Sequence, residues 1–157
     1  MLLQGSCHCG AVSFTVNSHS PQPYQRGYCS ICRKAGGAGG FAINIIADNE
    51  TKQVIGQDQV AEYRAVKGGQ LSHHRRYFCR QCGSHLWAWN ESCPELVHPL
   101  AAVVDTHLPK PSHFVDIMLD SAVPWVELHA GDYIERFADL PDQSIEAWRW
   151  RHSQWLD

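Results

Sequence analysis

The first clear pattern along the chain is an alternation of apolar and polar residues close to its start. Val12, Phe14 and Val16 are apolar, and Ser13 and Thr15 between them are polar. A period of two is typical of a strand with one buried face. The sequence therefore predicts a strand over residues 9–16.

Later segments rich in β-branched and aromatic residues are separated by turn-forming residues, and they predict further strands. Lys67-Gly68-Gly69 is typical of a hairpin turn between two of them. Short strands at this spacing predict a mainly β domain. The expected strands cover residues 41–46, 53–56, 60–66, 72–79, 84–90 and 114–119, with an apolar run over 96–104.

The pattern changes near the C-terminus, where apolar positions recur at steps of three and four. Ile145, Trp148, His152 and Trp155 follow Pro141 at this spacing. The spacing predicts a helix with one apolar stripe. Such a stripe docks on its own domain in most proteins, and a homodimer contact through the same face is the alternative.

Composition narrows the class of protein. The 157 residues favour a single domain, and 44% hydrophobic with 18% charged residues is ordinary for a globular chain. The net charge of −3 gives no global field that would recruit nucleic acid or an anionic membrane. No apolar run reaches the ~20 residues of a membrane span. Residues 1–5 show no secretory signal pattern, so a cytoplasmic protein is expected.

Candidate chemistry comes from seven cysteines, six of which lie in close pairs. In a reducing compartment such pairs indicate metal binding rather than disulfides. A C-x-C spacing is also poorly suited to a bridge, because the loop would be strained. The seventh, Cys93, is expected to be a small buried apolar side chain. The pairs are Cys7 with Cys9, Cys29 with Cys32, and Cys79 with Cys82.

Spacing alone leaves open which pairs share a metal. The pair 29/32 with the pair 79/82 would make a zinc ribbon. The pair 7/9 with the pair 79/82 would instead tie the N-terminal strand to the middle of the chain. Either closed site of four thiolates would be structural and would contribute much of the folding free energy.

Three ordered motifs resemble the glutathione-dependent formaldehyde-activating (CENP-V/GFA-type) family. Residues 5–14, GSCHCGAVSF, resemble its G-x-C-x-C-G-x-V-x-F opening. Residues 29–36, CSICRKAG, resemble its C-x-x-C-R-K-x-x-G segment, with Gly36 one place early. Residues 78–86, FCRQCGSHL, match its F-C-x-x-C-G-S-x-L signature, and Pro111-Ser-His-Phe114 with Trp125 resembles a later motif. The resemblance covers most of residues 3–129.

The resemblance implies a mainly β fold of short antiparallel strands, of the zinc-bound β-tent type. The zinc domain would cover residues 3–129, and a Trp-rich tail over 130–157 would form the C-terminal helix packed on it. The structural zinc is implied at Cys7, Cys9, Cys79 and Cys82.

The implied second zinc site departs from the family pattern. The family uses a C-x-C-x-x-C run with three thiolates and an open position, and here Gly27 stands in the place of the first cysteine. Only Cys29 and Cys32 remain as catalytic metal ligands, so a replacement ligand is needed for full affinity. The candidates are Cys93, His74, His85 and His113.

The resemblance implies a carbon–sulfur lyase acting on an aldehyde adduct of a glutathione-type thiol, with Zn²⁺ as cofactor. Arg33 and Lys34 are candidate contacts for the carboxylates of such a thiol, and otherwise they offset the zinc–thiolate charge. The alternative function is a non-catalytic, zinc-stabilised binding module, which the substitution at Gly27 favours. A nucleic-acid-binding zinc ribbon is disfavoured by the acidic balance.

Overall fold

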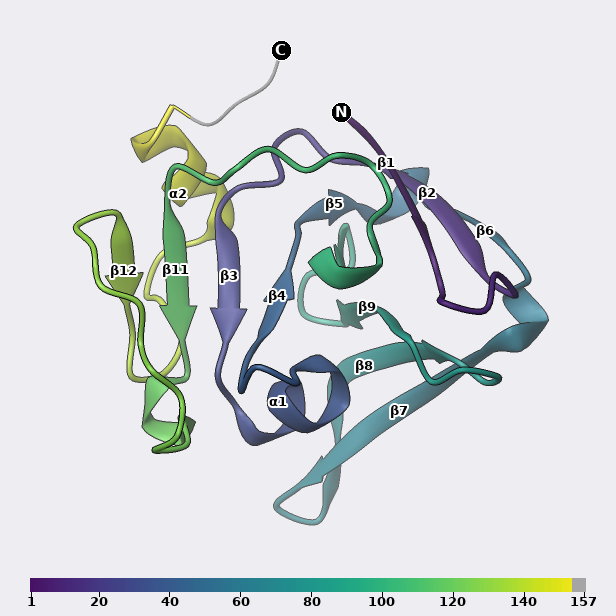
Figure 1. Ribbon diagram of the computed structural model, residues 1–157, viewed down its shortest axis with the longest axis horizontal. Helices are drawn as coiled ribbons and strands as arrows, with labels where there is room; N and C mark the ends of the chain where they lie inside the picture. Colours follow the sequence, from purple (N-terminus) through teal and green to yellow (C-terminus); the bar gives the residue numbers. More distant parts are fainter. Residues whose placement is uncertain (154–157) are drawn as a thin grey trace.

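A computed structural model describes residues 1–153 and confirms the predicted mainly β fold (Figure 1). Within this part of the chain, the strands form three sheets with the orders β1-β2-β6, β5-β10-β9-β8-β7 and β12-β11-β3-β4. The strands are β1 (Leu2–Ser6), β2 (Ser13–Asn17), β3 (Tyr24–Gly27), β4 (Ala42–Asn44), β5 (Ala47–Asp48), β6 (Gln53–Ile55), β7 (Val60–Lys67), β8 (Gln70–Cys79), β9 (His85–Asn90), β10 (Leu96–Pro99), β11 (Phe114–Ile117) and β12 (Ile134–Arg136). The α-helices are α1 (Ser30–Gly36) and α2 (Ile145–Arg151), and the 3₁₀ turns are η1 (Asn49–Thr51), η2 (Gln57–Gln59), η3 (Ala101–Val103) and η4 (Leu119–Ser121).

The alternating segment near the N-terminus forms β2, which lies between β1 and β6 with antiparallel register. Val12, Phe14 and Val16 are buried, as the period of two predicts. The Phe14 ring meets the Trp87 ring of β9 edge to face at a centroid distance of 5.4 Å. This contact joins the first sheet to the five-stranded sheet and forms the centre of the hydrophobic core.

The predicted hairpin turn joins β7 to β8. Gly68 and Gly69 have φ values of +57° and +80°, the left-handed conformation that glycine adopts without steric cost. The two strands pair from Val60 opposite Cys79 to Lys67 opposite Gln70. The hairpin therefore delivers Cys79 to the end of the sheet nearest the N-terminal segment.

The third sheet mixes antiparallel and parallel pairing, since β11 runs parallel to both β3 and β12. Arg26 on β3 and Asp116 on β11 are almost fully buried and form a two-point ion pair, with Nε–Oδ1 at 2.5 Å and Nη2–Oδ2 at 3.1 Å. The Arg26 guanidinium also lies over the Phe114 ring, 4.2 Å from its centroid. These contacts fix the end of β3, from which the chain continues to Cys29.

The C-terminal helix α2 begins at Ile145, four residues after Pro141, the start that the pattern predicts. The Ser144 hydroxyl caps it by accepting the Ala147 N–H at 3.1 Å. Trp148 is buried, and Arg149 donates to the main-chain carbonyls of Ser20 and Gln22. The helix thus packs on the chain itself, while Trp155 of the predicted stripe lies outside the described residues. The boundary between residues 129 and 130 stays a prediction.

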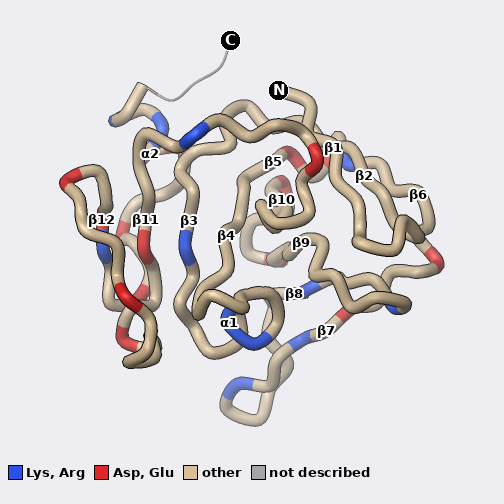
Figure 2. The backbone as a smooth tube through the Cα atoms, viewed as in Figure 1, with Lys and Arg blue, Asp and Glu red and all other residues tan. Residues whose placement is uncertain are grey.

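Charge is unevenly distributed over the fold. The side formed by α1, β7 and β8 carries mostly Lys and Arg, whereas the strands β11 and β12 and their loops carry mostly Asp and Glu (Figure 2). Among residues 1–153, no helix is both long enough and apolar enough to cross a membrane.

Candidate functional site

Four cysteines far apart in the sequence come together where β1 meets the end of β8. The Sγ atoms of Cys7, Cys9, Cys79 and Cys82 all lie within 4.8 Å of one another. The Cys7–Cys9 and Cys9–Cys79 Sγ distances are 3.5 and 3.7 Å. Four thiolates at ~2.3 Å around a tetrahedral zinc would have Sγ atoms about 3.8 Å apart. The cluster therefore fits a closed four-thiolate metal site.

Two tight turns aim these sulfurs at a common point. Gly10 and Gly83, with φ values of +77° and +73°, directly follow the second cysteine of each pair and let the chain reverse there. The Gly10 N–H donates to the Cys7 carbonyl at 3.0 Å, and the Gly83 N–H donates to the Cys79 carbonyl at 2.9 Å. The Val12 N–H also donates to the Cys7 Sγ at 3.2 Å, which stabilises a thiolate there.

Exposure and hydrogen bonding differ among the four cysteines. Cys7 and Cys79 are buried, and Cys9 and Cys82 close the site on its exposed side. The Ser84 hydroxyl, whose Oγ lies 3.2 Å from the Cys82 Sγ, lowers the pKa of that thiol to about 5. Cys82 is then a thiolate at neutral pH, the form that binds metals.

Cys29 and Cys32 form a separate pair at the start of α1. Their Sγ atoms lie 2.8 Å apart, and the Cys32 N–H donates to the Cys29 Sγ at 3.2 Å. The nearby Cys32 thiol lowers the pKa of Cys29 to about 5, and the same contact raises the pKa of Cys32. In the described part of the chain, no third His, Cys, Asp or Glu completes a metal-ligand group with this pair.

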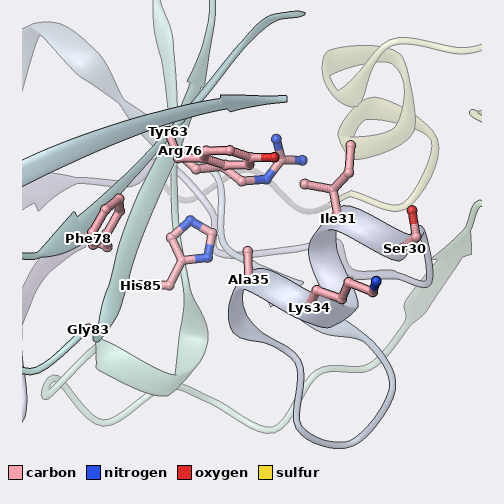
Figure 3. Close-up of a pocket in the computed structure, with 9 residues that line it drawn as sticks. All are labelled: Ser30, Ile31, Lys34, Ala35, Tyr63, Arg76, Phe78, Gly83 and His85. Atoms are coloured by element: carbon pink, nitrogen blue, oxygen red, sulfur yellow. The ribbon is translucent and has the colours of Figure 1, made fainter. Parts of the chain in front are cut away.

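The pair borders a cavity of about 610 Å³ between α1 and the five-stranded sheet. A second hollow of about 520 Å³ lies between α1 and the strands β7, β8 and β9 (Figure 3). Ile31, Arg76 and His85 line both. Figure 3 shows Arg76 and His85 projecting from the sheet toward α1. Cavities of this size hold ligands as large as a tripeptide.

Buried donors without partners face these cavities. Arg76 is only 6% exposed, its Nη1 has no hydrogen-bond partner, and its Nη2 lies 3.9 Å from the Cys32 Sγ. Both ring nitrogens of His85 are buried and also without a partner. Desolvation lowers the pKa values of His74, His85 and His98 to about 4, so all three rings are neutral at pH 7. The cavity lining thus carries two cations, Arg76 and the exposed Lys67, against one carboxylate, Asp139, together with neutral imidazoles, a balance that suits an anionic ligand.

Comparison with known proteins places these features in a family. The sequence model of the family described as "Glutathione-dependent formaldehyde-activating enzyme" matches residues 2–117. The chain belongs to this family. It is 46% identical over 151 residues to a curated Halomonas elongata protein named "Putative glutathione-dependent formaldehyde-activating enzyme", and the match covers 96% of each chain. It also resembles the crystal structure of a Rhodobacter sphaeroides protein, with a TM-score of 0.55, 28% identity, and coverage of 68% of this chain and 91% of that one.

The four-thiolate cluster of this GFA protein joins the two cysteine pairs that the family resemblance implied, and not the pairs of a zinc ribbon. Gly27, which stands at the first cysteine position of the family's C-x-C-x-x-C run, lies beside the Cys29–Cys32 pair. A Cβ built on Gly27 would be 3.3 Å from the Cys32 Sγ. A side chain at this position would be in tight contact with the Cys32 sulfur, and glycine supplies none, so the ligand of the family pattern is absent beside the pair.

The candidate replacement ligands separate into two groups. Cys93, His74 and His85 line the same cavity as the cysteine pair. His113 does not, because its ring packs against Trp148 and His152 near α2. None of the four completes a metal group with the pair in this structure.

Of the two candidate thiol contacts, Lys34 lines the smaller hollow, while Arg33 lines neither. Sequence reasoning missed Arg76 and His98 as cavity residues. The signal was present in part: Arg76 lies two residues after His74 on β8 and so shares its face of the sheet. His98 could be found only from the pairing of β10 with β9, which places it beside Ala88 and hence in line with Arg76.

Proposed function

We propose that this GFA protein is a carbon–sulfur lyase that forms and cleaves the bond between a glutathione-type thiol and an aldehyde. The observation that carries the proposal is the buried, unpaired Arg76 in a cavity of about 610 Å³ beside Cys29 and Cys32. The name of the Halomonas relative supports glutathione and formaldehyde as the substrate pair.

The cluster of Cys7, Cys9, Cys79 and Cys82 would hold Zn²⁺, as its sulfur spacing fits a tetrahedral ion. With four protein ligands it leaves no position for substrate, so its contribution is to the fold. Cys29 and Cys32 do not fit a catalytic zinc site, because only two thiols are present and their 2.8 Å separation is far below ~3.8 Å. The reaction is therefore assigned to protein side chains of the cavity.

The reaction needs a thiolate, a polarised aldehyde and one proton transfer. In the forward direction the thiol loses its proton, its sulfur attacks the carbonyl carbon, and the carbonyl π electrons move to oxygen. The Arg76 guanidinium would stabilise that oxyanion, since its Nη1 is free to donate. His85 would accept the thiol proton and return it to oxygen, because its neutral ring has both a donor and an acceptor without partners. Cleavage of the adduct is the reverse.

The second candidate function is a zinc-stabilised binding module without catalysis. Gly27 favours it, because the glycine removes a ligand from the position that the family pattern gives to a reactive metal. In that case the cavity would bind the thiol or its adduct and release it unchanged.

Exchange spectroscopy on glutathione and formaldehyde distinguishes the two. The lyase raises the rate at which free formaldehyde exchanges with its glutathione adduct, and Arg76→Ala lowers that enhancement by about a hundredfold, as loss of one oxyanion donor does. The matched control is Arg75→Ala, since Arg75 is the next residue on β8 and pairs with Glu62 and Glu91 outside the cavity. Zinc-loaded wild-type protein that binds glutathione without accelerating exchange would establish the binding module instead.

A further inference from the structure

The two sulfurs of the Cys29–Cys32 pair lie close enough for a disulfide to form with little movement. The Sγ–Sγ distance of 2.8 Å is shorter than the Cys7–Cys9 and Cys9–Cys79 distances of 3.5 and 3.7 Å in the four-thiolate cluster. A disulfide bond is ~2.05 Å long, so closure requires a movement of less than about 1 Å. The C-x2-C spacing at the start of α1 permits such a ring without displacing a strand.

The surroundings of the pair favour thiol chemistry over metal binding. No third ligand from residues 1–153 joins the two sulfurs, and the Gly27 position beside Cys32 has no side chain to offer. The Arg76 guanidinium instead lies close to the pair, with its Nη2 3.9 Å from the Cys32 Sγ. A buried cation repels a metal ion and stabilises a thiolate.

Both sulfurs can also be reached by a small molecule. Cys29 and Cys32 are half-buried, and both line the cavity of about 610 Å³. Cys93 lines the same cavity. The cluster cysteines Cys7 and Cys79, in contrast, are buried in the core.

We propose that Cys29 and Cys32 are a reversible redox pair that exchanges with low-molecular-weight disulfides of the glutathione type. In the first step one thiolate, Cys29, attacks a sulfur of the small disulfide, whose S–S bond breaks to release one thiolate and leave a mixed disulfide. In the second step Cys32 loses its proton and attacks the Cys29 sulfur, releasing the second small thiol. The protein pair is oxidised by two electrons, and the small disulfide is reduced to two thiols.

The activity does not depend on the carbon–sulfur lyase reaction, and its test contains no aldehyde. Zinc-loaded protein is equilibrated with mixtures of reduced and oxidised glutathione and examined by intact mass, peptide mapping and zinc content. The expected product is one Cys29–Cys32 disulfide per chain, seen as the loss of two hydrogens, with zinc retained. Excess reduced glutathione should restore both thiols.

Three variants make the test specific. Cys32→Ser should stop at a mixed disulfide on Cys29, with the added mass of one glutathionyl group. Cys93→Ser, the control in the same cavity, should form the Cys29–Cys32 disulfide as the wild type does. Gly27→Cys should bind a second zinc and lose disulfide formation until that zinc is chelated, because it restores the third thiolate beside Cys32.

The proposal is overturned if the wild type forms no Cys29–Cys32 disulfide at any glutathione ratio. It is equally overturned if oxidation joins Cys93 to the pair in preference, or if oxidation proceeds only as zinc leaves the four-thiolate cluster. Gly27→Cys protein that binds zinc yet oxidises like the wild type would also contradict it, since the missing ligand would then be irrelevant.

Discussion

The molecule contains two sites built from closely spaced cysteine pairs, and the sites differ in the residues that face those pairs. Around Cys7, Cys9, Cys79 and Cys82, two turns from distant parts of the chain face each other, and the sulfurs take tetrahedral spacing. Around Cys29 and Cys32, the facing position is Gly27, and the sulfurs approach to 2.8 Å. The same residue type thus serves a closed metal site in one place and an open pair of thiols in the other.

The comparison shows how much depends on what faces a cysteine pair. The closed cluster receives main-chain N–H donors and lies against the hydrophobic core. The open pair receives Arg76, a cation without a carboxylate partner among the described residues, and borders a cavity. A missing ligand therefore removes more than metal affinity, because the remaining thiols face a ligand-sized space beside a positive charge.

The largest expected effect comes from opening the closed cluster. Cys79→Ser removes a ligand whose side chain is fully buried, and should abolish zinc retention. Structural zinc binding is worth about 10–16 kcal/mol in zinc-finger peptides, so loss of the metal should cost most of the folding free energy. Zinc content and thermal unfolding measure this. Cys93→Ser is the control, and normal melting with full zinc content in Cys79→Ser would remove the cluster from its structural role.

A smaller effect is expected from breaking the Arg26–Asp116 ion pair, which holds the strand that leads to Cys29. Asp116→Ala leaves the Arg26 guanidinium buried without its partner, which should lower the free energy of unfolding by about 3–5 kcal/mol. Because β3 leads to Cys29 and not to the four-thiolate cluster, the folded fraction should keep its zinc. Urea unfolding with metal analysis checks both results. The exposed Asp120 provides the control, since Asp120→Ala should change stability by less than about 0.5 kcal/mol.

The smallest expected effect is a change in the pH dependence of stability, caused by His98, which lines the cavity. His98 has its pKa lowered from 6.5 to about 4 by desolvation, so the unfolded chain binds a proton in this window that the folded protein does not. Stability should therefore fall as pH decreases from about 6.5 toward 4, by up to about 1.4 kcal/mol per pH unit from this one residue.

His98→Gln should reduce the slope of unfolding free energy against pH below about 6.5, because the variant lacks the one proton that His98 takes up on unfolding. Urea unfolding of both proteins at several pH values above and below 6 measures the difference, in which the contribution of the cluster cancels. Parallel slopes for the two proteins would show that His98 is not held neutral by the cavity.

The sequence alone predicted those features that depend on neighbours along the chain. The alternation at Val12, Phe14 and Val16 predicted β2 and its buried face, and Lys67-Gly68-Gly69 predicted the β7–β8 turn. The family resemblance, and not spacing, selected the partner of the Cys79–Cys82 pair, because spacing fits either pairing.

The remaining features depend on contacts between distant segments, for which the pattern carries little signal. The parallel pairing of β11 with β3 brings together residues about ninety positions apart, as in Arg26 and Asp116. The cavity residues Arg76 and His98 meet only through strand register. The helix α2 starts at Ile145 because Ser144 supplies the cap, and Pro141 marked its start too early.

The most direct test of the contrast between the two sites is the zinc content of protein purified under reducing conditions without chelators. We expect one zinc per chain, which a Cys29→Ala/Cys32→Ala double variant retains and a Cys79→Ser variant loses. Two zinc ions per chain in the wild type, one of them lost in the double variant, would contradict the account, since Cys29 and Cys32 would then be metal ligands despite Gly27.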